Sequence, residues 1–399
     1  MKILIASDFY KNNLGGVTTS IIGLYGGLLS KGHDVKILTL ANNNKSYKED
    51  NVYYIKSFPV YYAPDMRMSL ALRDPLLKEI ENWNPDIIHV QSEGSAFLMS
   101  RIIRRKCKCP LIITCHTDYA YYVFGERRKN PIIEAITKIA AYVVYKPATK
   151  IVVPSKKALS FPFLKAFKDR LVVIPNGIKI EEKSLKLSNS ERQTMLETLG
   201  IDENKKILVA ITRLSKEKNI EEIIEYLPGL LNKNKDVVLL IVGAGRDKQH
   251  LLDITKELNL ENNVIFVNRK PENEVWHYYA LGDVFVSAST FEVHSMSYLE
   301  AMAEGLPLLC RNDEALDGVL DHNVNGLIYN NQNEFVEYAN KLLSDDGFRK
   351  QMSLGSLNKI KEFSAEIFAQ KALDLYKKLI AKNSQNDLDL YKELAEEGE

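Results

Sequence analysis

The most informative segment for the architecture is KILIASDFYKNNLGGVTTSIIGLYGGLLSKGHDVKILT, residues 2–39. It begins with a largely apolar run, Lys2–Ser7, typical of a parallel strand that is buried on both faces. Apolar residues at helical spacing follow over Val17–Leu29, Gly32-His33 ends that helix, and Asp34–Thr39 predicts a second strand. A strand, a helix and a strand within about 40 residues make a βαβ unit.

Strands and helices go on alternating in two series. The first series gives strands at 86–90, 111–114, 150–153 and 171–174, and a polar linker region follows at 180–203 with a helix at Glu191–Leu199. The second gives strands at 206–211, 237–242, 264–267, 284–286 and 307–310, and helices at 221–232, 248–258, 272–281 and 296–304. This alternation predicts an α/β protein with two Rossmann-like, doubly wound parallel-sheet domains.

The expected domain boundaries follow from these series. We expect an N-terminal domain over 1–180 and a C-terminal domain over 181–364. Residues 333–381 are expected to be helical throughout, and the helix at 365–381 is expected to pack back on the first domain. An acidic, frayed tail over 382–399 completes the prediction, since chain ends are often poorly ordered.

Composition places the protein among soluble globular enzymes and binding proteins. The chain has 399 residues, of which 45% are hydrophobic and 26% are charged. Its longest apolar runs are far shorter than the roughly 20 residues of a bilayer span. Asp8 and Lys11 leave no room for a signal-peptide core, so a cytoplasmic location is expected. Reduced structural thiols are expected at Cys107, Cys109, Cys115 and Cys310.

The net charge of +1 conceals two halves of opposite sign. Residues 1–180 carry 27 Lys and Arg against 14 Asp and Glu, a net charge of +13, which leaves −12 for the remainder. A basic half suits an anionic membrane surface, an anionic small molecule or a nucleic acid. Two such halves indicate two domains with different partners.

Glycines and cations follow several strands at positions where α/β sheets bind ligands. Gly15-Gly16 lies between the first strand and its helix, where a phosphate or sugar can approach the helix N-terminus; a plain turn is the alternative. Arg213 and Lys218 follow the first strand of the second series and suit a diphosphate; a solvated charged loop is the alternative.

Two further strand ends carry candidates. Gly243-Ala-Gly245 is compatible with close approach of a nucleotide, but Gln249-His250 replaces the third glycine of a dinucleotide fingerprint, which disfavours an NAD enzyme. His116 follows the strand at 111–114, a position suited to chemistry. A hydrogen-bonded structural histidine is the alternative there.

Two glutamates mark the richest segment, residues 287–309. Glu292 is expected in a loop after a strand, and Glu300 two turns into the next helix. Carboxylates at such positions accept hydrogen bonds from sugar hydroxyls. Spacing alone favours the alternative, an exposed pair of helix acids.

A basic and aromatic stretch over 101–129 favours a functional face against an anionic membrane. The residues that we assign to this face are Arg101, Arg104, Arg105, Lys106, Tyr119, Tyr121, Tyr122, Phe124, Arg127 and Arg128. An ordinary solvated surface is the alternative. Asp387-Leu-Asp389 spells the D-x-D pattern that some sugar transferases use for a metal, but it does not follow a strand, so no metal site is expected.

The order of these motifs resembles the retaining, nucleotide-sugar-dependent glycosyltransferases of family 4, which have the two-domain GT-B fold. The resemblance covers nearly the whole chain. The motifs that carry it are Gly15-Gly16, Gly32-His33-x-Val35, Pro85-Asp-Ile-Ile-His89, Pro175-Asn-Gly177, Arg213 with Glu217-Lys218-Asn219, and Glu292-x7-Glu300 with Ala301-Met-Ala-x-Gly305-x-Pro307.

The resemblance implies roles by position. Arg213 and Lys218 would bind the donor diphosphate, Glu300 the ribose, and Glu292 with the backbone after it the transferred sugar. His116 would contact the sugar near the reacting carbon, and the donor would lie in a cleft between the domains. No metal and no cofactor is implied. Donor contacts are further assigned to Gly15, Gly16, Gly243, His294, Ser295, Met296 and Ser297.

Within that family, His116-Thr-Asp-Tyr119 and the run 289–302 are similar to bacterial 1,2-diacylglycerol 3-glucosyltransferases. The similarity implies UDP-glucose as donor, a lipid acceptor and a peripheral position on the inner face of the cell membrane. Ser295 stands where a glycine is usual, and Val267-Asn268 replaces an aromatic-glycine pair, which puts the donor's identity in question. A polysaccharide or soluble acceptor, a nucleotide-sugar epimerase, and a non-catalytic sugar-nucleotide or nucleic-acid binder remain the alternatives.

Overall fold

The computed structural model describes the chain except for residues 11–14, 62, 181–186 and 397–399, and leaves undescribed the side chains of 63–65, 122, 126, 128, 272 and 386–396. It divides into an N-terminal unit, Met1–Lys179 with Ser364–Glu399, and a C-terminal unit, Ile180–Phe363. The chain therefore enters the C-terminal unit once and returns to the first unit for its last helix. None of the described helices is both long and apolar enough to cross a membrane.

A largely parallel sheet forms the centre of the N-terminal unit. Its strand order is β10-β9-β8-β7-β1-β2-β4-β3, in which only β3 runs antiparallel to its neighbour. β1 lies between β2 and β7, so the chain reverses its direction of travel across the sheet there. The strands are β1 (Lys2–Ala6), β2 (Asp34–Leu40), β3 (Tyr47–Glu49), β4 (Val52–Ile55), β7 (Ile87–Val90), β8 (Leu111–Thr114), β9 (Lys150–Val153) and β10 (Leu171–Val173).

The predicted strands of this unit are confirmed, but two features were missed. β3 and β4 extend the sheet beyond β2, and the hairpin β5 (Phe58–Val60) and β6 (Ala63–Met68) stands apart from it. β3 and β5 have three residues each, and β6 contains a proline and two charged residues, so these segments lack the apolar run of the predicted strands. The helices of the unit are α1 (Gly16–Ser30), α2 (Pro75–Trp83), α3 (Ser95–Cys107), α4 (Tyr119–Phe124), α5 (Pro131–Tyr145) and α13 (Ala365–Glu396).

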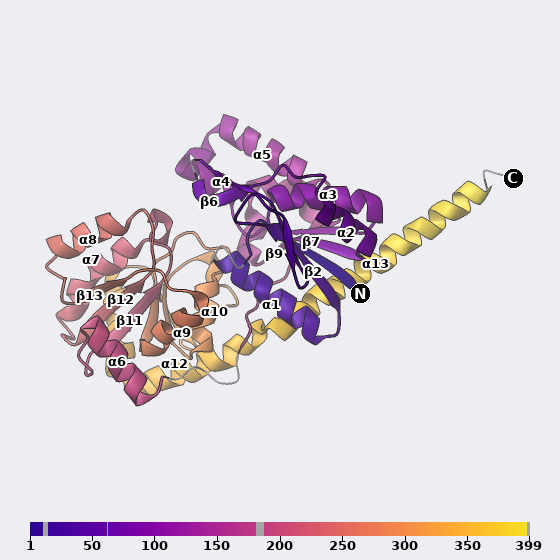
Figure 1. The fold of residues 1–399 in the computed structure, drawn as a ribbon. Coiled ribbons are helices and arrows are strands. Elements are labelled where there is room, and N and C mark those ends of the chain that lie inside the picture. Colours follow the sequence, from indigo (N-terminus) through magenta and orange to yellow (C-terminus); the bar gives the residue numbers. More distant parts are fainter. Residues whose placement is uncertain (11–14, 62, 181–186, 397–399) are drawn as a thin grey trace. The chain divides into compact units, whose positions relative to one another are not determined.

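The last helix, α13, packs along α1 within the N-terminal unit (Figure 1). Gly27 permits the contact, since a Cβ there would lie 2.3 Å from the carbonyl oxygen of Ala365. Gly23 faces another segment, where a Cβ would lie 2.5 Å from the carbonyl oxygen of Gly177. The nitrogen of Ala365 also donates to the oxygen of Ile178 at 2.8 Å. Phe368, Leu373, Tyr376 and other α13 residues complete the core of this unit.

The C-terminal region differs from the prediction in two ways. The helical stretch expected over 333–381 is interrupted at Asp345, whose carboxylate accepts from the nitrogen of Phe348 and starts a new helix, and again by a 3-10 turn at Ile360–Phe363. α13 also continues through Glu396, so the separate frayed tail expected from 382 is wrong over the described residues.

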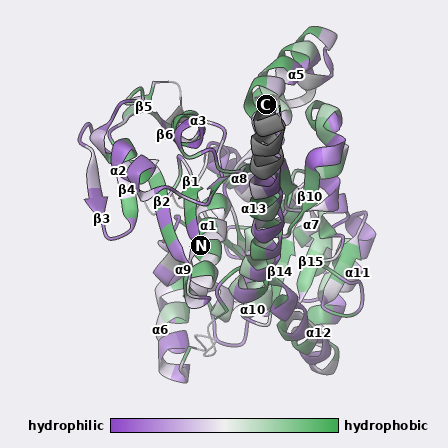
Figure 2. Cartoon of the chain, turned by 90° about the vertical axis from the view of Figure 1, so that its right-hand side faces the viewer, coloured by the Kyte–Doolittle hydropathy of each residue, from purple (hydrophilic) through white to green (hydrophobic). Residues whose placement is uncertain are grey.

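The sheet of the C-terminal unit is wholly parallel, with the order β13-β12-β11-β14-β15-β16. Its strands are largely apolar and buried, and β14 and β15 are mostly green in Figure 2. The strands are β11 (Lys206–Ile211), β12 (Val237–Val242), β13 (Val264–Val267), β14 (Val284–Ser287), β15 (Leu308–Arg311) and β16 (Gly326–Tyr329).

The helices of this unit lie close to their predicted positions. The sequence missed β16, whose Gly326 packs so tightly on β15 that a Cβ there would lie 2.1 Å from the oxygen of Leu308. A Ser188–Glu191 capping box starts the first helix of the unit. The helices are α6 (Asn189–Leu199), α7 (Ile220–Leu231), α8 (Lys248–Glu257), α9 (Glu272–Leu281), α10 (Met296–Ala303), α11 (Gln332–Ser344) and α12 (Asp346–Lys359).

Candidate active site

Two loops meet where the strand order of the C-terminal sheet reverses, between β11 and β14. Parallel α/β sheets bind ligands at such switch points, beyond the carboxyl ends of the strands. Lys218 follows β11 and Glu292 follows β14, and their side chains form an ion pair with Nζ 2.5 Å from Oε1. The two side chains are only 18% and 12% exposed. Glu292 is therefore not one of two exposed helix acids.

Backbone contacts hold these loops together. The nitrogen of Thr290 donates to the carbonyl oxygen of Glu217 at 3.1 Å, and the Ser289 hydroxyl donates to the same oxygen at 3.3 Å. Lys218 is the residue after Glu217, and Glu292 stands two residues after Thr290, so the ion pair is close in sequence to these hydrogen bonds. The cation and the carboxylate are thus fixed by the loop backbone as well as by each other.

Arg213 belongs to the same loop and contacts Glu217. Its Nη2 lies 2.6 Å from Oε1 of Glu217. The same oxygen accepts a 2.6 Å hydrogen bond from the Ser215 hydroxyl. Burial by itself would raise the pKa of Glu217, but hydrogen bonds from Ser215, the backbone and Arg213 outweigh it and hold that pKa below its usual value. The Arg213 side chain is half exposed and oriented by a carboxylate that stays ionised.

Glu300 lies on α10, and its Oε2 accepts a 2.8 Å hydrogen bond from the hydroxyl of Tyr279 on α9. Burial, and then the charge of Glu300, raise the pKa of Tyr279 well above its usual value, so this phenol stays a donor. Because α10 begins at Met296, Glu300 stands just over one turn into the helix, not two as predicted. No motif in the sequence pointed to Tyr279.

The N-terminus of α10 carries the other donor residues assigned from the resemblance. His294, Ser295 and Met296 are all buried, and the His294 ring packs on Phe363 with 5.6 Å between centroids. The Ser295 hydroxyl lies 3.0 Å from that of Ser297. The buried side chains of His294 and Met296 pack within the unit, and so it is the backbone N–H groups of this helix end that can serve an anionic ligand.

The glycines after β12 have a packing role. A Cβ on Gly243 would lie 1.9 Å from the oxygen of Thr212, and one on Gly245 would lie 1.9 Å from the oxygen of Leu214. The nitrogen of Leu214 donates to the oxygen of Ala244 at 3.0 Å. The expectation that these glycines serve a nucleotide is therefore unnecessary, since close approach of the two loops already requires them.

In the N-terminal unit, His116 and Gln91 lie together after neighbouring strands. Nε2 of His116 lies 2.8 Å from Oε1 of Gln91, and an N–H at Nε2 donates to that oxygen. Gln91 is 2% exposed, and its Nε2 has no hydrogen-bond partner among the described residues. Gln91 was not predicted, although it follows β7 directly at the switch point between β1 and β7.

Gly15 precedes α1, and Gly16 begins it. A Cβ on Gly15 would meet no described atom within 4 Å, so packing does not require a glycine there. The backbone of Gly15 is extended, with φ near 171°, a conformation that any residue adopts. The assignment of Gly15 and Gly16 to the donor therefore stays a prediction.

A buried polar cluster lies beside His116. Glu93 accepts a 2.7 Å hydrogen bond from the Tyr145 hydroxyl and a further one from Tyr119, and burial raises the pKa of Glu93 to about 7. Burial also raises the pKa of Asp8, whose carboxylate accepts from the nitrogen of Ala96 at the start of α3. Tyr119 was assigned to a membrane face, and that assignment is wrong because its hydroxyl points inward.

The basic and aromatic stretch 101–129 does not form one face. Its first part lies at the C-terminal end of α3, which leads into β8, and its second part follows β8 in α4 and a 3-10 turn at Gly125–Lys129. The two parts are therefore at opposite ends of a strand about 13 Å long. Arg105, Lys106 and Arg127 are exposed, and Arg101, Arg104, Tyr121 and Phe124 are half-buried. The side chains of Tyr122 and Arg128 lie outside the described residues.

No described group of three His, Cys, Asp or Glu residues is arranged as a metal site. The side chains of Asp387 and Asp389 are outside the described residues. Cys107, Cys109, Cys115 and Cys310 are free thiols, as predicted.

Family models match both units: the model for "Glycosyltransferase Family 4" matches residues 14–182, and the model for "Glycosyl transferases group 1" matches residues 191–356. With two parallel-sheet units and a site at each switch point, the chain belongs to the family 4 glycosyltransferases of the GT-B fold. It is an enzyme that transfers sugars.

Two of the similar proteins carry the same, more specific name. The chain is 26% identical to an alpha-monoglucosyldiacylglycerol synthase of Acholeplasma laidlawii, over 96% of this chain and 99% of that one. It is 28% identical to the synthase of the same name from Streptococcus pneumoniae, over 97% and 88%. The chain is thus similar to bacterial diacylglycerol glucosyltransferases, as the sequence predicted.

Solved structures share the fold. Anabaena HepE in complex with UDP and glucose superimposes with a TM-score of 0.74 at 19% identity, covering 95% of this chain and all of that one. WaaG, a glycosyltransferase involved in lipopolysaccharide biosynthesis, superimposes with a TM-score of 0.67 at 16% identity, covering 94% and 99%.

Proposed function

We propose that the protein transfers glucose, with retention of configuration and without a metal, from UDP-glucose to diacylglycerol at the cytoplasmic face of the membrane. The observation that carries the lipid acceptor is the surface of α5. Ile132, Ile136, Ile139 and Val143 recur there at helical spacing and are 71%, 53%, 67% and 57% exposed. Exposed apolar stripes of this kind mark membrane or protein interfaces.

Cations stand at both ends of this stripe. Arg127 and Lys129 precede α5, and Arg104 contacts the carbonyl of Pro147 just after it, with Nη1 2.6 Å from the oxygen. α5 has 15 residues and is about 22 Å long, and it separates in the chain the cations that precede it from Arg104 at Pro147. An apolar stripe with basic ends suits an anionic bilayer.

The paired residues in the C-terminal unit support the following chemistry. The bond between the anomeric carbon and the diphosphate breaks, the acceptor oxygen bonds to that carbon on the same face, and the acceptor's proton passes to a diphosphate oxygen. Arg213 and Lys218 offset the negative charge that develops on the leaving nucleoside diphosphate. Glu292 accepts hydrogen bonds from the sugar, and Glu300 from the ribose. The diphosphate oxygen is the base in this step, and the transfer needs no protein nucleophile.

Transfer of label from UDP-glucose into vesicles, with and without diacylglycerol and in the presence of EDTA, tests the proposal. The expected result is label in the organic phase that depends on diacylglycerol and persists in EDTA. Label found instead on a sugar or a soluble acceptor would contradict the proposed lipid acceptor and assign that compound as the acceptor. Conversion of UDP-glucose with no acceptor present would indicate an epimerase.

A further inference from the structure

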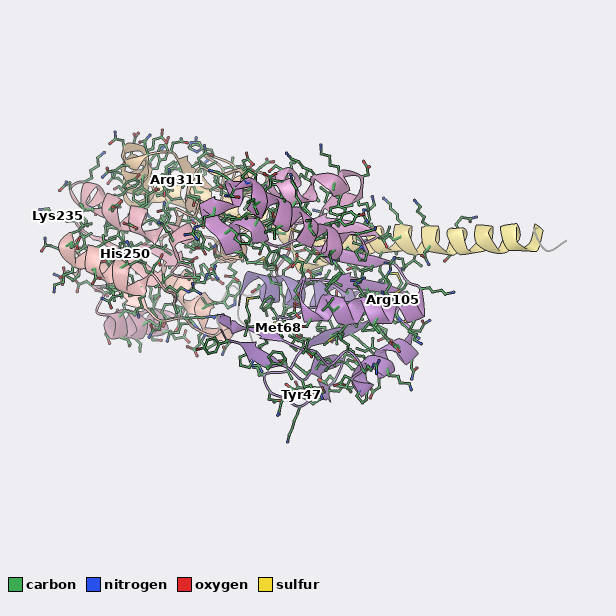
Figure 3. The ribbon with its side chains drawn as sticks, turned by 90° about the horizontal axis from the view of Figure 1, so that it is seen from above. Tyr47, Met68, Arg105, Lys235, His250 and Arg311 are labelled. Atoms are coloured by element: carbon green, nitrogen blue, oxygen red, sulfur yellow. The ribbon has the colours of Figure 1, made fainter. Side chains whose placement is uncertain are left out.

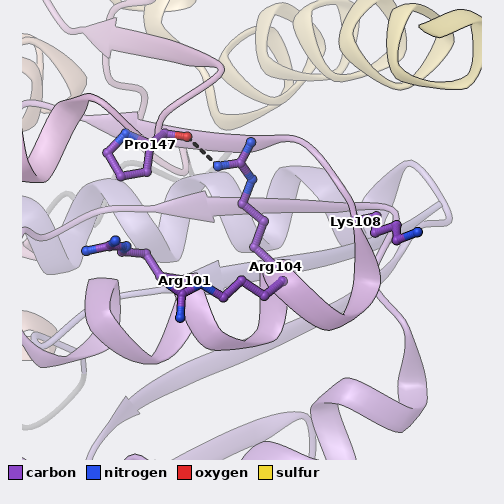
Figure 4. Close-up of a pocket in the computed structure, with 5 residues that line it drawn as sticks. Arg101, Arg104, Lys108 and Pro147 are labelled. Carbon is purple, nitrogen blue, oxygen red and sulfur yellow. Dashed lines mark hydrogen bonds between the residues drawn. The ribbon is translucent and has the colours of Figure 1, made fainter. Parts of the chain in front are cut away.

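Four cations surround one pocket at the C-terminal end of α3 (Figure 4). The pocket has a volume of about 230 Å³ and is lined by Arg101, Arg104, Arg105, Lys108 and Pro147. No acidic side chain is among these described lining residues. Arg105 lies on the exposed side of α3 (Figure 3), and Lys108 follows the helix in a left-handed conformation, with φ 51°.

The half-buried guanidinium of Arg104 forms the inner wall. Among the described residues, Nη1 donates to the oxygen of Pro147 at 2.6 Å, and the other N–H groups of the guanidinium have no described acceptor. Burial lowers the pKa of Arg104, and the neighbouring charge of Arg101 lowers it further. Gathering four like charges around a partly desolvated space is unfavourable unless an anion offsets them.

A helix end explains only part of this cluster. The C-terminal end of a helix attracts cations, which accounts for basic residues in the last turn of α3. It does not account for a concave site closed by Pro147, a residue from another segment. Lys106, in the same turn, does not line the pocket. The geometry therefore separates Lys106 from the residues with which the sequence had grouped it.

We propose that this pocket binds the phosphate group of an anionic phospholipid headgroup. Guanidinium forks bind phosphate oxygens in pairs, and a lysine adds a point charge. Pro147 stands two residues beyond α5, so the pocket opens beside the end of the apolar stripe. This step rests on the proposed membrane role of α5: a helix lying in the bilayer surface would place the pocket at the depth of the headgroups.

Two charge-matched variants of the full chain test the site. Arg105→Gln with Lys108→Gln removes two charges from the pocket rim, whereas Lys78→Gln with Lys106→Gln removes two exposed charges outside it. Arg104 is kept because it holds Pro147. Sedimentation measures binding to phosphatidylcholine vesicles that contain phosphatidylglycerol, and to vesicles that contain oleate at equal surface charge.

We expect the pocket variant to lose at least about fivefold in binding to phosphatidylglycerol vesicles, and the control variant to lose clearly less. The pocket variant should bind oleate vesicles as the control does. Equal losses in both variants on both vesicles would overturn the proposal in favour of diffuse attraction. Binding of glycerol 3-phosphate that is lost in the pocket variant, with vesicle binding unchanged, would assign the pocket to a soluble phosphate instead.

The vesicle-binding test of the pocket can fail independently of the transfer test of the proposed function. Vesicle binding needs neither donor nor acceptor, and glucosyl transfer is measured with diacylglycerol in detergent micelles. Normal transfer together with equal vesicle binding by both variants would overturn only the phosphate site. Selective loss of phosphatidylglycerol binding in a protein that does not glucosylate diacylglycerol would overturn only the proposed acceptor.

Discussion

Lys218 and Glu292 come from loops 74 residues apart in the chain and form a 2.5 Å ion pair between mostly buried side chains. The pair lies where the sheet order reverses, and each partner holds the other in position before any ligand arrives. Preorganised charges of this kind stabilise a developing anion without further rearrangement.

Glu292→Gln and Lys218→Met should each lower kcat/KM by about 10²–10³, because each removes one partner of a charge arrangement aimed at the donor. Steady-state kinetics with UDP-glucose, together with the double variant, measures the coupling. The double variant should lose much less than the sum of the single losses. Glu337→Gln, an exposed change on α11, is the control. Wild-type turnover by Glu292→Ala with an intact fold would remove this glutamate from the site.

Gln91→Leu should lower kcat by about 10–100-fold with little change in KM for the donor, since it removes the acceptor that orients His116. Gln91→Glu should keep that acceptor and shift the acid limb of the pH–rate profile to higher pH, because a nearby carboxylate favours the charged imidazole. A purely structural Gln91 would change thermal stability in both variants and leave the pH profile of Gln91→Glu where it was.

Adjacent glycines of α1 should respond in opposite directions. Gly27→Ala should lower the free energy of unfolding by about 1–3 kcal/mol, because its Cβ would lie 2.3 Å from a carbonyl oxygen at the start of α13. Gly26→Ala should raise it by about 0.5–1 kcal/mol, since no described atom lies within 4 Å and alanine favours a helix. Urea denaturation measures both. Equal effects would show that α13 does not rest on this face.

Glu93→Gln should stabilise the protein at pH 8 more than at pH 5. With a folded-state pKa of about 7 against a usual value of 4.5, the folded protein binds a proton that the unfolded chain has released between these values. The free energy of unfolding therefore falls as pH rises from 4.5 to 7 and stays lower above that window. Glutamine does not titrate, so the variant loses this pH dependence of the free energy of unfolding. We expect its Tm to rise by about 2 °C at pH 8. A gain of equal size at both pH values would exclude this titration.

The sequence predicted the βαβ series well because buried parallel strands are almost wholly apolar, as in Val237–Val242. It could not predict hydrogen-bond partners that are distant in the sequence and meet only in the folded protein, such as Tyr279 for Glu300 or Gln91 for His116. The stripe on α5 was visible as helical spacing at Ile132, Ile136 and Ile139, but whether a stripe faces a core or solvent is settled only by packing. For the same reason, the sequence did not show that Gly243 packs against the loop at Thr212, and its assignment to the donor stays a prediction.

The return of α13 to the first unit sets the order in which the protein can fold on the ribosome. Phe368, Leu373 and Tyr376 belong to the core of the N-terminal unit but are made last, after the whole of Ile180–Phe363. The first domain to be synthesised is therefore the last to be completed, and the inserted domain can fold before it. Ribosome-bound chains that stop before Ala365 should display an incomplete N-terminal core, a surface that chaperones would have to cover until synthesis ends.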